Sequence, residues 1–433
     1  MNLEELTKRE LIELYKASTK QIRDLVKEIE KLKRQVEKLS GSKELPHFIK
    51  PNVDNAEPKK LGAKEGHEGV TRPTPEKVDE KKEVGMKRCP RGHRIAKIKE
   101  KKKRIVEDIE IVRRTRVTEY ELQGYWCKKC KKKVFPKIFE AMPGFRLGMN
   151  FCNYVCERKF GYRMTYNLIQ KDLLENFGLK VSQGTLVNAV HAVSNLLGKK
   201  YELYKTLLRE GKFVHIDETG WRVNGTNLWL WKFKSKNAVV TVINWRRSHV
   251  IPEDVLGKDY KGTAIVDGYS AYNLLQCEKQ RCWTHLTRHS RNARKKYPES
   301  NEVKEFHESL KNLYDRSKRA KKCKRNRTFF ENNMKRLLGK RYRNPEIVKI
   351  KKFIIKHFDE MFVFVEKNIE GTNNAAERAI RNDVIIRKIS GGNRSPNGRH
   401  DYEVISSVMQ TCHLRNEDFS EIVMDELKSA ADG

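Results

Sequence analysis

Three carboxylates stand where the sequence predicts that folded elements begin or end. Asp217 closes the apolar run Phe-Val-His-Ile, and Asp267 closes the shorter run Thr-Ala-Ile-Val. Alternate side chains of a strand point to opposite faces, so each run is typical of a buried strand that carries one aspartate to its end. Glu377 lies in Asn-Asn-Ala-Ala-Glu-Arg, a pattern that favours a helix start. Two strand ends and one helix would then supply three carboxylates.

Three carboxylates are a suitable ligand set for metal-dependent phosphoryl transfer. Mg²⁺ prefers oxygen ligands and uses one or two carboxylates beside water and substrate phosphate. Two such ions, about 3.5–4 Å apart, stabilise the attacking and leaving oxygens of an in-line displacement, and they keep crowded carboxylates ionised. We therefore predict that Asp217, Asp267 and Glu377 bind two Mg²⁺ or Mn²⁺ ions. The alternative is structural: the aspartates could be turn residues, and Asn374 with Glu377 could form a capping box.

Four motifs that contain or follow these carboxylates resemble a known family. They are, in chain order, His215-Ile-Asp-Glu-Thr-Gly-Trp, Asp267-Gly-Tyr-Ser-Ala-Tyr, Arg281-Cys-Trp-Thr-His-Leu-Thr-Arg and Asn373-Asn-Ala-Ala-Glu-Arg-Ala-Ile-Arg. Together they resemble the catalytic core of insertion sequence 66 family transposases. The resemblance implies a DDE enzyme, which uses two aspartates and a glutamate on a ribonuclease-H-like fold. One departure is Arg387-Lys-Ile-Ser, where the family usually has Arg-Lys-Asn-Trp.

A second group of metal ligands lies nearer the N-terminus. Cys89-Pro-Arg-Gly-His93 and Cys127-Lys-Lys-Cys130 are two ligand pairs, and the alternating Val, Ile, Tyr and Thr residues of 105–125 between them are typical of a hairpin. Three thiolates and one imidazole would make a tetrahedral zinc ribbon with no open position for substrate. The alternatives are unliganded cysteines and a redox Cys-x-x-Cys pair, but the βαβ context of a redox pair is absent from the sequence. We therefore predict one structural zinc ion on these four residues.

The elements expected to hold the carboxylates follow a simple order. After the strand that ends at Asp217, residues 227–233 and 238–244 are predicted to form two more strands. They would give the antiparallel meander that precedes Asp267 in ribonuclease-H-like folds. Residues 281–286 are predicted to form a further short strand.

Cys282 and His285 in this last stretch have the spacing of metal ligands. Two residues are too few for a closed zinc site, and the sequence indicates no third partner. The family resemblance implies that the pair supports the active site. A packed cysteine and a hydrogen-bonded histidine are the simpler interpretation, which we prefer.

Residues 146–210 are predicted to be helical and to resemble a helix-turn-helix. An amphipathic helix at 165–177 is followed by the turn Gly178-Leu-Lys-Val, and Ser182 caps the next helix. An ordinary helical hairpin is the alternative. The residues of the second helix that could contact bases or phosphates are Gln183, Thr185 and Asn188.

Composition predicts a polyanionic partner. The 433 residues include 92 Lys and Arg against 57 Asp and Glu, a formal net charge of +35. Because each neutralised phosphate releases counterions, double-stranded DNA, as element ends and target, is the expected partner. Basic residues of the glutamate helix that could hold DNA are Arg378, Arg381, Arg387 and Lys388. Residues 290–360 form a Lys/Arg-rich helical insertion, which could be a solvated face or part of a DNA channel.

Other composition features concern compartment. No apolar run approaches the roughly 20 residues needed to span a bilayer, and the N-terminus lacks a signal-peptide core. We expect a cytoplasmic, prokaryotic protein without a membrane partner that is associated with the nucleoid when bound to DNA. Nine cysteines, an odd number, favour thiols and metal ligands over a disulfide framework.

The first 40 residues carry a heptad pattern. Ile22, Leu25, Ile29, Leu32 and Val36 alternate steps of three and four, with β-branched residues at a and Leu at d. That pattern favours a parallel two-stranded coiled coil and therefore a homodimer or higher oligomer. A helix folded against its own chain is the alternative.

The sequence therefore predicts a multidomain α/β protein. The expected segments are a coiled-coil helix at 1–40, a flexible basic linker at 41–87, a zinc ribbon at 88–145, a helical, helix-turn-helix-like DNA-binding region at 146–210, a ribonuclease-H-like DDE catalytic domain at 211–400 with a helical insertion at about 290–360, and a C-terminal helical segment at 401–433.

The preferred interpretation is an insertion-sequence transposase that cleaves and joins DNA at the terminal inverted repeats of its element. One alternative is a DNA-binding regulator with a catalytically silent nuclease-like domain. Another is a nuclease of the same fold without strand transfer. The presence of all three carboxylates favours an enzyme. Some family members use companion transposition proteins, and the sequence alone does not decide whether this protein needs them.

Overall fold

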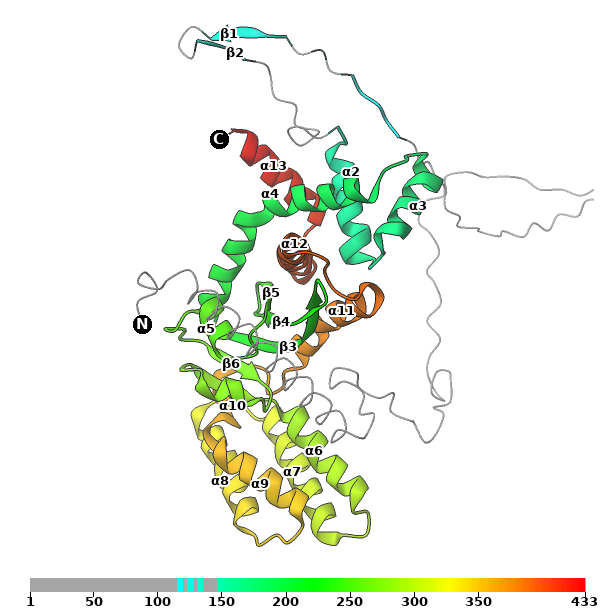
Figure 1. Ribbon diagram of the computed structural model, residues 1–433. Helices are drawn as coiled ribbons and strands as arrows, with labels where there is room; N and C mark the ends of the chain where they lie inside the picture. The colour runs from blue at the N-terminus through cyan, green and yellow to red at the C-terminus, as the bar shows by residue number, and fades with distance from the viewer. Residues whose placement is uncertain (1–114, 120, 122, 128–130, 135–145, 433) are drawn as a thin grey trace, which may run out of the picture. The chain divides into compact units, whose positions relative to one another are not determined.

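The computed structural model describes residues 115–119, 121, 123–127, 131–134 and 146–432 (Figure 1). All of them belong to the second of the chain's two units, Ile111–Gly433. The predicted coiled coil, the basic linker and the zinc ligands Cys89, His93 and Cys130 fall outside the described residues. None of the described helices is both long enough and apolar enough to cross a membrane.

A short hairpin lies at the predicted zinc ribbon. Strands β1 (Tyr125–Cys127) and β2 (Lys132–Val134) are antiparallel, with Cys127 opposite Lys132. The prediction placed the hairpin at 105–125, yet Tyr125 is the only described residue of that stretch in a strand. In the described hairpin, β1 ends at Cys127 of the second ligand pair and β2 begins at Lys132. Lys131, directly before β2, has a φ of +50°.

A five-stranded mixed sheet occupies the centre of the predicted catalytic domain. Its strands, in spatial order, are β5 (Val239–Asn244), β4 (Thr226–Lys234), β3 (Phe213–Val223), β6 (Thr263–Val266) and β7 (Glu278–Arg281). The predicted antiparallel meander of β3, β4 and β5 is confirmed. Strands β6 and β7 run parallel to β3. This order and these directions are compatible with a nuclease-like fold.

The strand that carries Asp217 is longer than predicted. β3 continues to Val223, so Asp217 lies inside the strand and pairs with Lys232 of β4. The parallel pairing with β6 includes His215 and Ile265 and goes no further. The predicted end is wrong because Thr-Gly after Asp217 resembles a turn, whereas the turn that joins β3 to β4 comes later, at Asn224 and Gly225. Asp217 is thus placed where its parallel neighbour stops.

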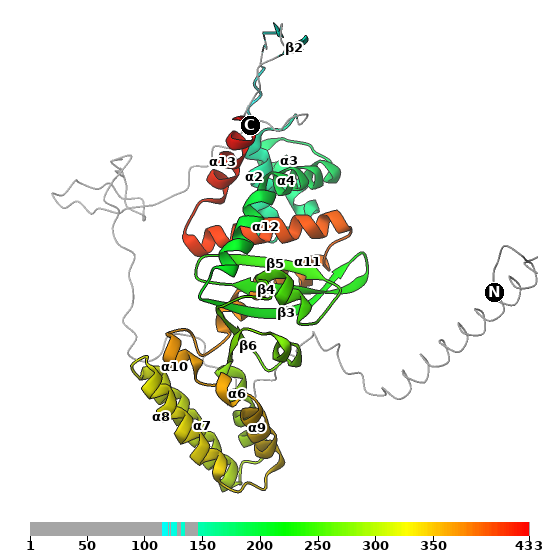
Figure 2. The same cartoon turned by 90° about the vertical axis from the view of Figure 1, so that its left-hand side faces the viewer.

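Helix α12 (Pro396–Arg415) covers the outer edge of the sheet, as Figure 2 shows. The backbone N–H groups of alternate β5 residues donate to side chains spaced four apart on the helix. Val239 N lies 2.9 Å from Thr411 Oγ1, and Thr241 N lies 2.8 Å from Ser407 Oγ. The edge of β5 is therefore not left open to another strand.

Helix α11 (Asn374–Ser390), which carries Glu377, packs on β3 and β4. Asp383 and Lys232 of β4 form an ion pair at 2.9 Å, with both side chains fully buried. Asp383 also accepts a hydrogen bond of 2.8 Å from Tyr402 of α12. One buried polar network thus joins strand β4 of the sheet to α11 and α12.

The loop after α11 is tied back to β3. Gly391 ends the helix in the left-handed region, and Asn393 N donates to Arg222 O at 2.9 Å. The Gly, Asn, Ser and Pro residues of 391–398 are typical of a loop, but α12 begins at Pro396, with Ser395 as its N-cap. A proline at the first helical position suits a helix start, so the Ser-Pro pair begins a helix.

Helices are present on both sides of the turn at Gly178, as expected for either a helix-turn-helix or an ordinary helical hairpin. The helices before the sheet are α2 (Met149–Cys156), the π-helix η2 (Glu157–Gly161), α3 (Tyr166–Phe177) and α4 (Gln183–Arg209). Thr165 and Ser182 cap α3 and α4, and Gly178 ends α3 with a φ of +64°. α4 runs for 27 residues and packs on α12, so it is also part of the core.

Most of the remaining helices form a second apolar core. They are α6 (Trp283–Lys296), α7 (Asn301–Arg319), α8 (Lys324–Gly339), α9 (Pro345–Lys356), η4 (Phe358–Glu360) and α10 (Val363–Lys367). Within the predicted helical insertion, Phe306, Leu310 and Leu313 of α7 have helical spacing, and all three are buried in this core. Outside it lie α5 (Val250–Leu256), η3 (Ser270–Leu274) and α13 (Phe419–Asp432).

The predicted strand at 281–286 is wrong. β7 ends at Arg281, Cys282 is an N-cap, and α6 begins at Trp283. The buried residues of α6 are Trp283, Leu286, Ser290 and Ala293. Steps of three and four place these side chains on one face of a helix, so the longer pattern overrides the short apolar run. The helical insertion consequently starts before position 290.

Candidate active site

Asp217 and Asp267 come from neighbouring parallel strands. The register pairs His215 with Ile265, and each aspartate comes two positions later in the chain, Asp217 within β3 and Asp267 directly after the end of β6. Asp217 Oδ1 accepts from Glu218 N at 3.0 Å, and Asp267 Oδ1 accepts from Tyr269 N at 2.8 Å. The other carboxylate oxygens of these two residues are the ones available to a ligand.

Glu377 reaches the same place from the first turn of α11. Its backbone N–H donates to Asn373 O at 3.2 Å, which fixes that turn. Burial raises the pKa of Asp217 well above its ordinary value, and the negative charges of Glu218, Asp267 and Glu377 raise it further. The three predicted carboxylates therefore interact electrostatically, although they come from three separate elements.

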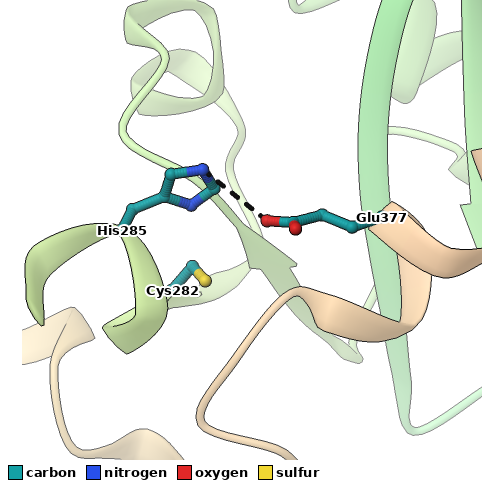
Figure 3. A group of neighbouring side chains, drawn as sticks. All are labelled: Cys282, His285 and Glu377. Atoms are coloured by element: carbon teal, nitrogen blue, oxygen red, sulfur yellow. Dashed lines mark ion pairs between the residues drawn. The ribbon is translucent and has the colours of Figure 1, made fainter. Parts of the chain in front are cut away.

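Cys282, His285 and Glu377 form a compact group of possible metal ligands (Figure 3). One ligand atom from each lies within 4.8 Å of the others, and His285 Nε2 is 3.6 Å from Glu377 Oε1. The sequence indicated no third partner for Cys282 and His285, because Glu377 is about 90 positions away from them. The one signal in the sequence that could have connected Cys282 and His285 with Glu377 is that they lie in consecutive motifs of the same family pattern.

The donor set fits a divalent cation. Two buried atoms here, His285 Nδ1 and Glu377 Oε1, have no hydrogen-bond partner among the described residues. Buried carboxylates that repel one another are stabilised when a cation lies between them. Of the three carboxylates predicted to bind metal, Glu377 belongs to this group, together with Cys282 and His285.

Glu218 has different surroundings from Asp217. Its carboxylate accepts two hydrogen bonds from Arg247, the shorter at 2.9 Å, and one from the Tyr272 hydroxyl. The Arg247 guanidinium lies 4.1 Å from the Trp229 ring centre and 4.2 Å from that of Tyr269. Both tyrosines belong to the motif that follows Asp267. The first two motifs of the sequence are therefore joined through Arg247, which sequence reasoning missed.

The predicted DNA-contacting residues of α4 are accessible at its N-terminus. Gln183 and Asn188 are exposed and Thr185 is half-buried. They lie on the first two turns of the helix, where Leu186 and Ala189 are buried. This arrangement leaves polar side chains of α4 free of the core.

The predicted basic residues of α11 divide into two groups. Arg378, Arg381 and Lys388 are exposed, whereas Arg387 donates from Nη1 to Thr219 Oγ1 at 3.0 Å and to Gly220 O. Arg387 therefore contacts β3, which the sequence did not indicate.

A cavity of about 590 Å³ lies beside α11 and α12. It is lined by basic side chains, amides and apolar groups that include Arg378, Lys234, His413, Asn382 and Gln410. Arg378 follows Glu377 in the sequence, but none of the three carboxylates lines this cavity.

Comparison with protein families identifies the chain. Residues 144–401 match the model of the family described as Transposase IS66 family. The matched region runs from just before α2 into α12 and includes Asp217, Asp267 and Glu377. Among curated proteins, no sequence matches the chain. Because the family match covers more than half of its length, the protein belongs to the IS66 family of transposases.

Proposed function

We propose that this protein cleaves DNA at the ends of its element and joins the freed ends to target DNA, using Asp217, Asp267 and Glu377 as metal ligands. The proposal is supported by the charge interaction of Asp267 and Glu377 with Asp217, which raises the pKa of Asp217 beside a nuclease-like sheet, and by the family match that includes all three residues. A ribonuclease-H-like DDE domain is the architecture that this combination favours.

The chemistry would be in-line phosphoryl transfer. When bound, two Mg²⁺ or Mn²⁺ ions would stabilise the charge that develops on the attacking and leaving oxygens. The protein's own contribution is positioning: β3, β6 and α11 hold the three carboxylates in fixed relation to one another. Water would attack the scissile phosphate first, and the released 3′-hydroxyl would then attack the target phosphodiester. In such a transfer the protein forms no covalent bond to the substrate and acts mainly by positioning and charge stabilisation.

DNA binding would rest on the basic surface. Arg378, Arg381 and Lys388 extend that surface along the exposed side of α11. Gln183, Thr185 and Asn188 at the start of α4 would reach bases or phosphates, as the second helix of a helix-turn-helix does. Arg387 would act differently, by fixing α11 against β3 next to the bound strand.

We also propose that Cys89, His93, Cys127 and Cys130 bind one structural zinc ion. Support comes from the ligand types and from the β1–β2 hairpin that brackets Cys127 and Cys130. Metal analysis of the purified protein decides the matter. Less than stoichiometric zinc, or zinc retained when Cys127 and Cys130 are both changed to Ser, contradicts the assignment.

The test of the chemistry is to change each carboxylate separately. Asp217→Asn, Asp267→Asn and Glu377→Gln should each bind element ends normally in Ca²⁺, because affinity depends on the basic residues. In Mg²⁺ each should cut at least about 100-fold more slowly than the unmodified protein, because metal placement is damaged. Gel-shift and cleavage assays on DNA carrying the element's inverted repeats measure both.

Glu210→Gln is the matched control, since Glu210 is an exposed carboxylate at the end of α4. It should cut at the normal rate. Normal cleavage by any of the three variants removes that residue from the site. Binding without cleavage by the unmodified protein favours the regulator, and cleavage without joined products favours a simple nuclease.

A further inference from the structure

Asn373 lies where three of the site-forming elements meet. The residue immediately precedes α11 and its side chain is buried, with 1% of its surface exposed. Its Nδ2 donates to Ile216 O of β3 at 2.7 Å. Its backbone N–H donates to Cys282 Sγ, at the start of α6, at 3.1 Å. One residue is therefore hydrogen-bonded to β3 and to the beginning of α6, and begins the helix that carries Glu377.

The side-chain oxygen of Asn373 completes the connection to β3. Oδ1 lies 3.3 Å from His215 Nδ1. Because Nδ2 must donate to the Ile216 carbonyl, Oδ1 is the acceptor and the histidine nitrogen donates to it. The amide thus joins two consecutive residues of β3, and Asp217 is the next residue along the strand.

This use of the side chain is unusual for the residue at a helix N-cap. Asn and Asp at that position usually accept from a backbone N–H of the first turn. Asn373 makes no such bond. Asn344 provides the contrast, because it is also a buried N-cap and its side chain accepts from Glu346 N at 3.0 Å. The side-chain amide of Asn373 therefore forms its hydrogen bonds with β3 and does not cap its own helix.

Only an amide can make both bonds to β3. A carboxylate offers no donor to the Ile216 carbonyl, a hydroxyl is too short to reach two residues, and an apolar side chain offers neither group. The path from Asn373 to each carboxylate is short and rigid. It reaches Asp217 through one peptide unit after Ile216, and it reaches Glu377 through the first turn of α11, where Glu377 N donates to Asn373 O.

We propose that Asn373 is a positioning residue, which sets the separation of Glu377 from Asp217 so that the two carboxylates can share metal ions. It contacts neither the ions nor the DNA. The inference rests on the proposed function, because it concerns the same carboxylates. Groups that orient metal ligands in this way typically change metal affinity or activity by about 10–100-fold when they are removed.

The test is Mn²⁺ binding by the full-length protein, followed by the electron paramagnetic resonance signal of free Mn²⁺. The variants are Asn373→Ala and Asn373→Leu, of which the second keeps the number and the branching of the side-chain heavy atoms. We expect both to bind Mn²⁺ about 10–100-fold more weakly than the unmodified protein. Their slower cleavage should recover when the Mn²⁺ concentration is raised, and their affinity for DNA in Ca²⁺ should not change.

Asn344→Ala is the matched control for loss of a buried, helix-capping asparagine. It should lower the melting temperature and leave Mn²⁺ affinity unchanged. Asn373→Ala and Asn373→Leu fill the site differently, so if one variant does not fold the other carries the test. Reduced stability with unchanged Mn²⁺ affinity in a folded Asn373 variant would mean a purely structural residue, which overturns the proposal.

Asp217→Asn separates this inference from the proposed function. If Asp217→Asn binds Mn²⁺ as well as the unmodified protein does, the carboxylate site itself is wrong and the role of Asn373 falls with it. If Asp217→Asn loses Mn²⁺ binding while both Asn373 variants retain it, the carboxylate site stands and the positioning role alone is overturned.

Discussion

Asp217 and Glu218 are adjacent carboxylates with different surroundings. Successive side chains of a strand point to opposite faces. Asp217 accepts from a backbone N–H, whereas Glu218 is held by Arg247 and Tyr272. Arg247 is in turn held between two aromatic rings. Glu218 therefore has its hydrogen bonds supplied by protein groups, and Asp217 still has an oxygen available.

We expect Glu218→Gln to retain much more cleavage activity than Asp217→Asn. The glutamine oxygen can still accept from Arg247 or Tyr272, and the cost should be about 1–3 kcal/mol of stability for the weakened charged hydrogen bonds. Cleavage assays and urea unfolding measure the two effects. Equal loss of activity in the two variants would make Glu218 a member of the metal site.

Residue types predicted the carboxylates but not their partners. Asp217, Asp267 and Glu377 could be chosen because an acidic residue after an apolar strand, or in a first helical turn, is visible locally. The contact of Asn373 with Ile216 is not visible, because it joins positions 157 apart. The same holds for Cys282 with Glu377. The capping-box alternative was also local, yet the N-cap is Asn373 rather than Asn374.

Among the elements, α11 depends most on buried polar contacts. Lys232 and Asp383 are fully buried, and burial lowers the pKa of Lys232 while the charge of Asp383 raises it. A buried ion pair is weak evidence for stability by itself, but removing one partner leaves an uncompensated charge. The position of α11 on the sheet should therefore be sensitive to either residue.

Lys232→Met should lower the free energy of unfolding by about 3–5 kcal/mol. Adding Asp383→Asn should restore part of that loss, because no buried charge then remains and the amide oxygen can still accept from Tyr402. Urea unfolding at neutral pH measures both. Lys171→Met is the control, since Lys171 and Glu175 form an exposed pair and the expected change is below about 1 kcal/mol. A loss that small in Lys232→Met contradicts the prediction.

Elements with long periodic patterns were predicted well, and short ones were not. The strands at 227–233 and 238–244 and the helix at 165–177 agree with β4, β5 and α3 within about two residues. Residues 281–286 were wrong because a short apolar run does not separate strand from helix. The end of β3 was wrong for another reason, since Thr219 and Gly220 pair with β4 although their types favour a turn.

For the whole molecule, the net charge indicates a polyanionic partner and the N-terminal heptads predict association of two copies, and neither follows from the described fold. The chain has a net charge of +35, and the described part of its fold is built on two apolar cores. The heptads of residues 1–40 lie outside the described residues, so the coiled coil stays a prediction. Two copies of the protein would place two catalytic domains in one complex, one for each element end.

Leu25→Lys combined with Leu32→Lys should convert the protein to a monomer, because two charges would be buried at the d positions of the seam. Analytical ultracentrifugation of the full-length protein measures the change. Glu28→Lys, at a g position on the rim of the seam, is the control and should weaken association much less. An oligomeric state that is the same with and without the two lysines contradicts the coiled coil.

The position of Glu377 has a consequence for synthesis on the ribosome. Glu377 is 110 positions after Asp267, and the second core is translated between them. At about 5–20 residues per second, the nascent chain carries both aspartates for roughly 5–20 s before it contains the glutamate. During that interval, and in any product of premature termination before position 377, the carboxylate set is incomplete. On the proposed function, truncated translation products should therefore be unable to nick DNA.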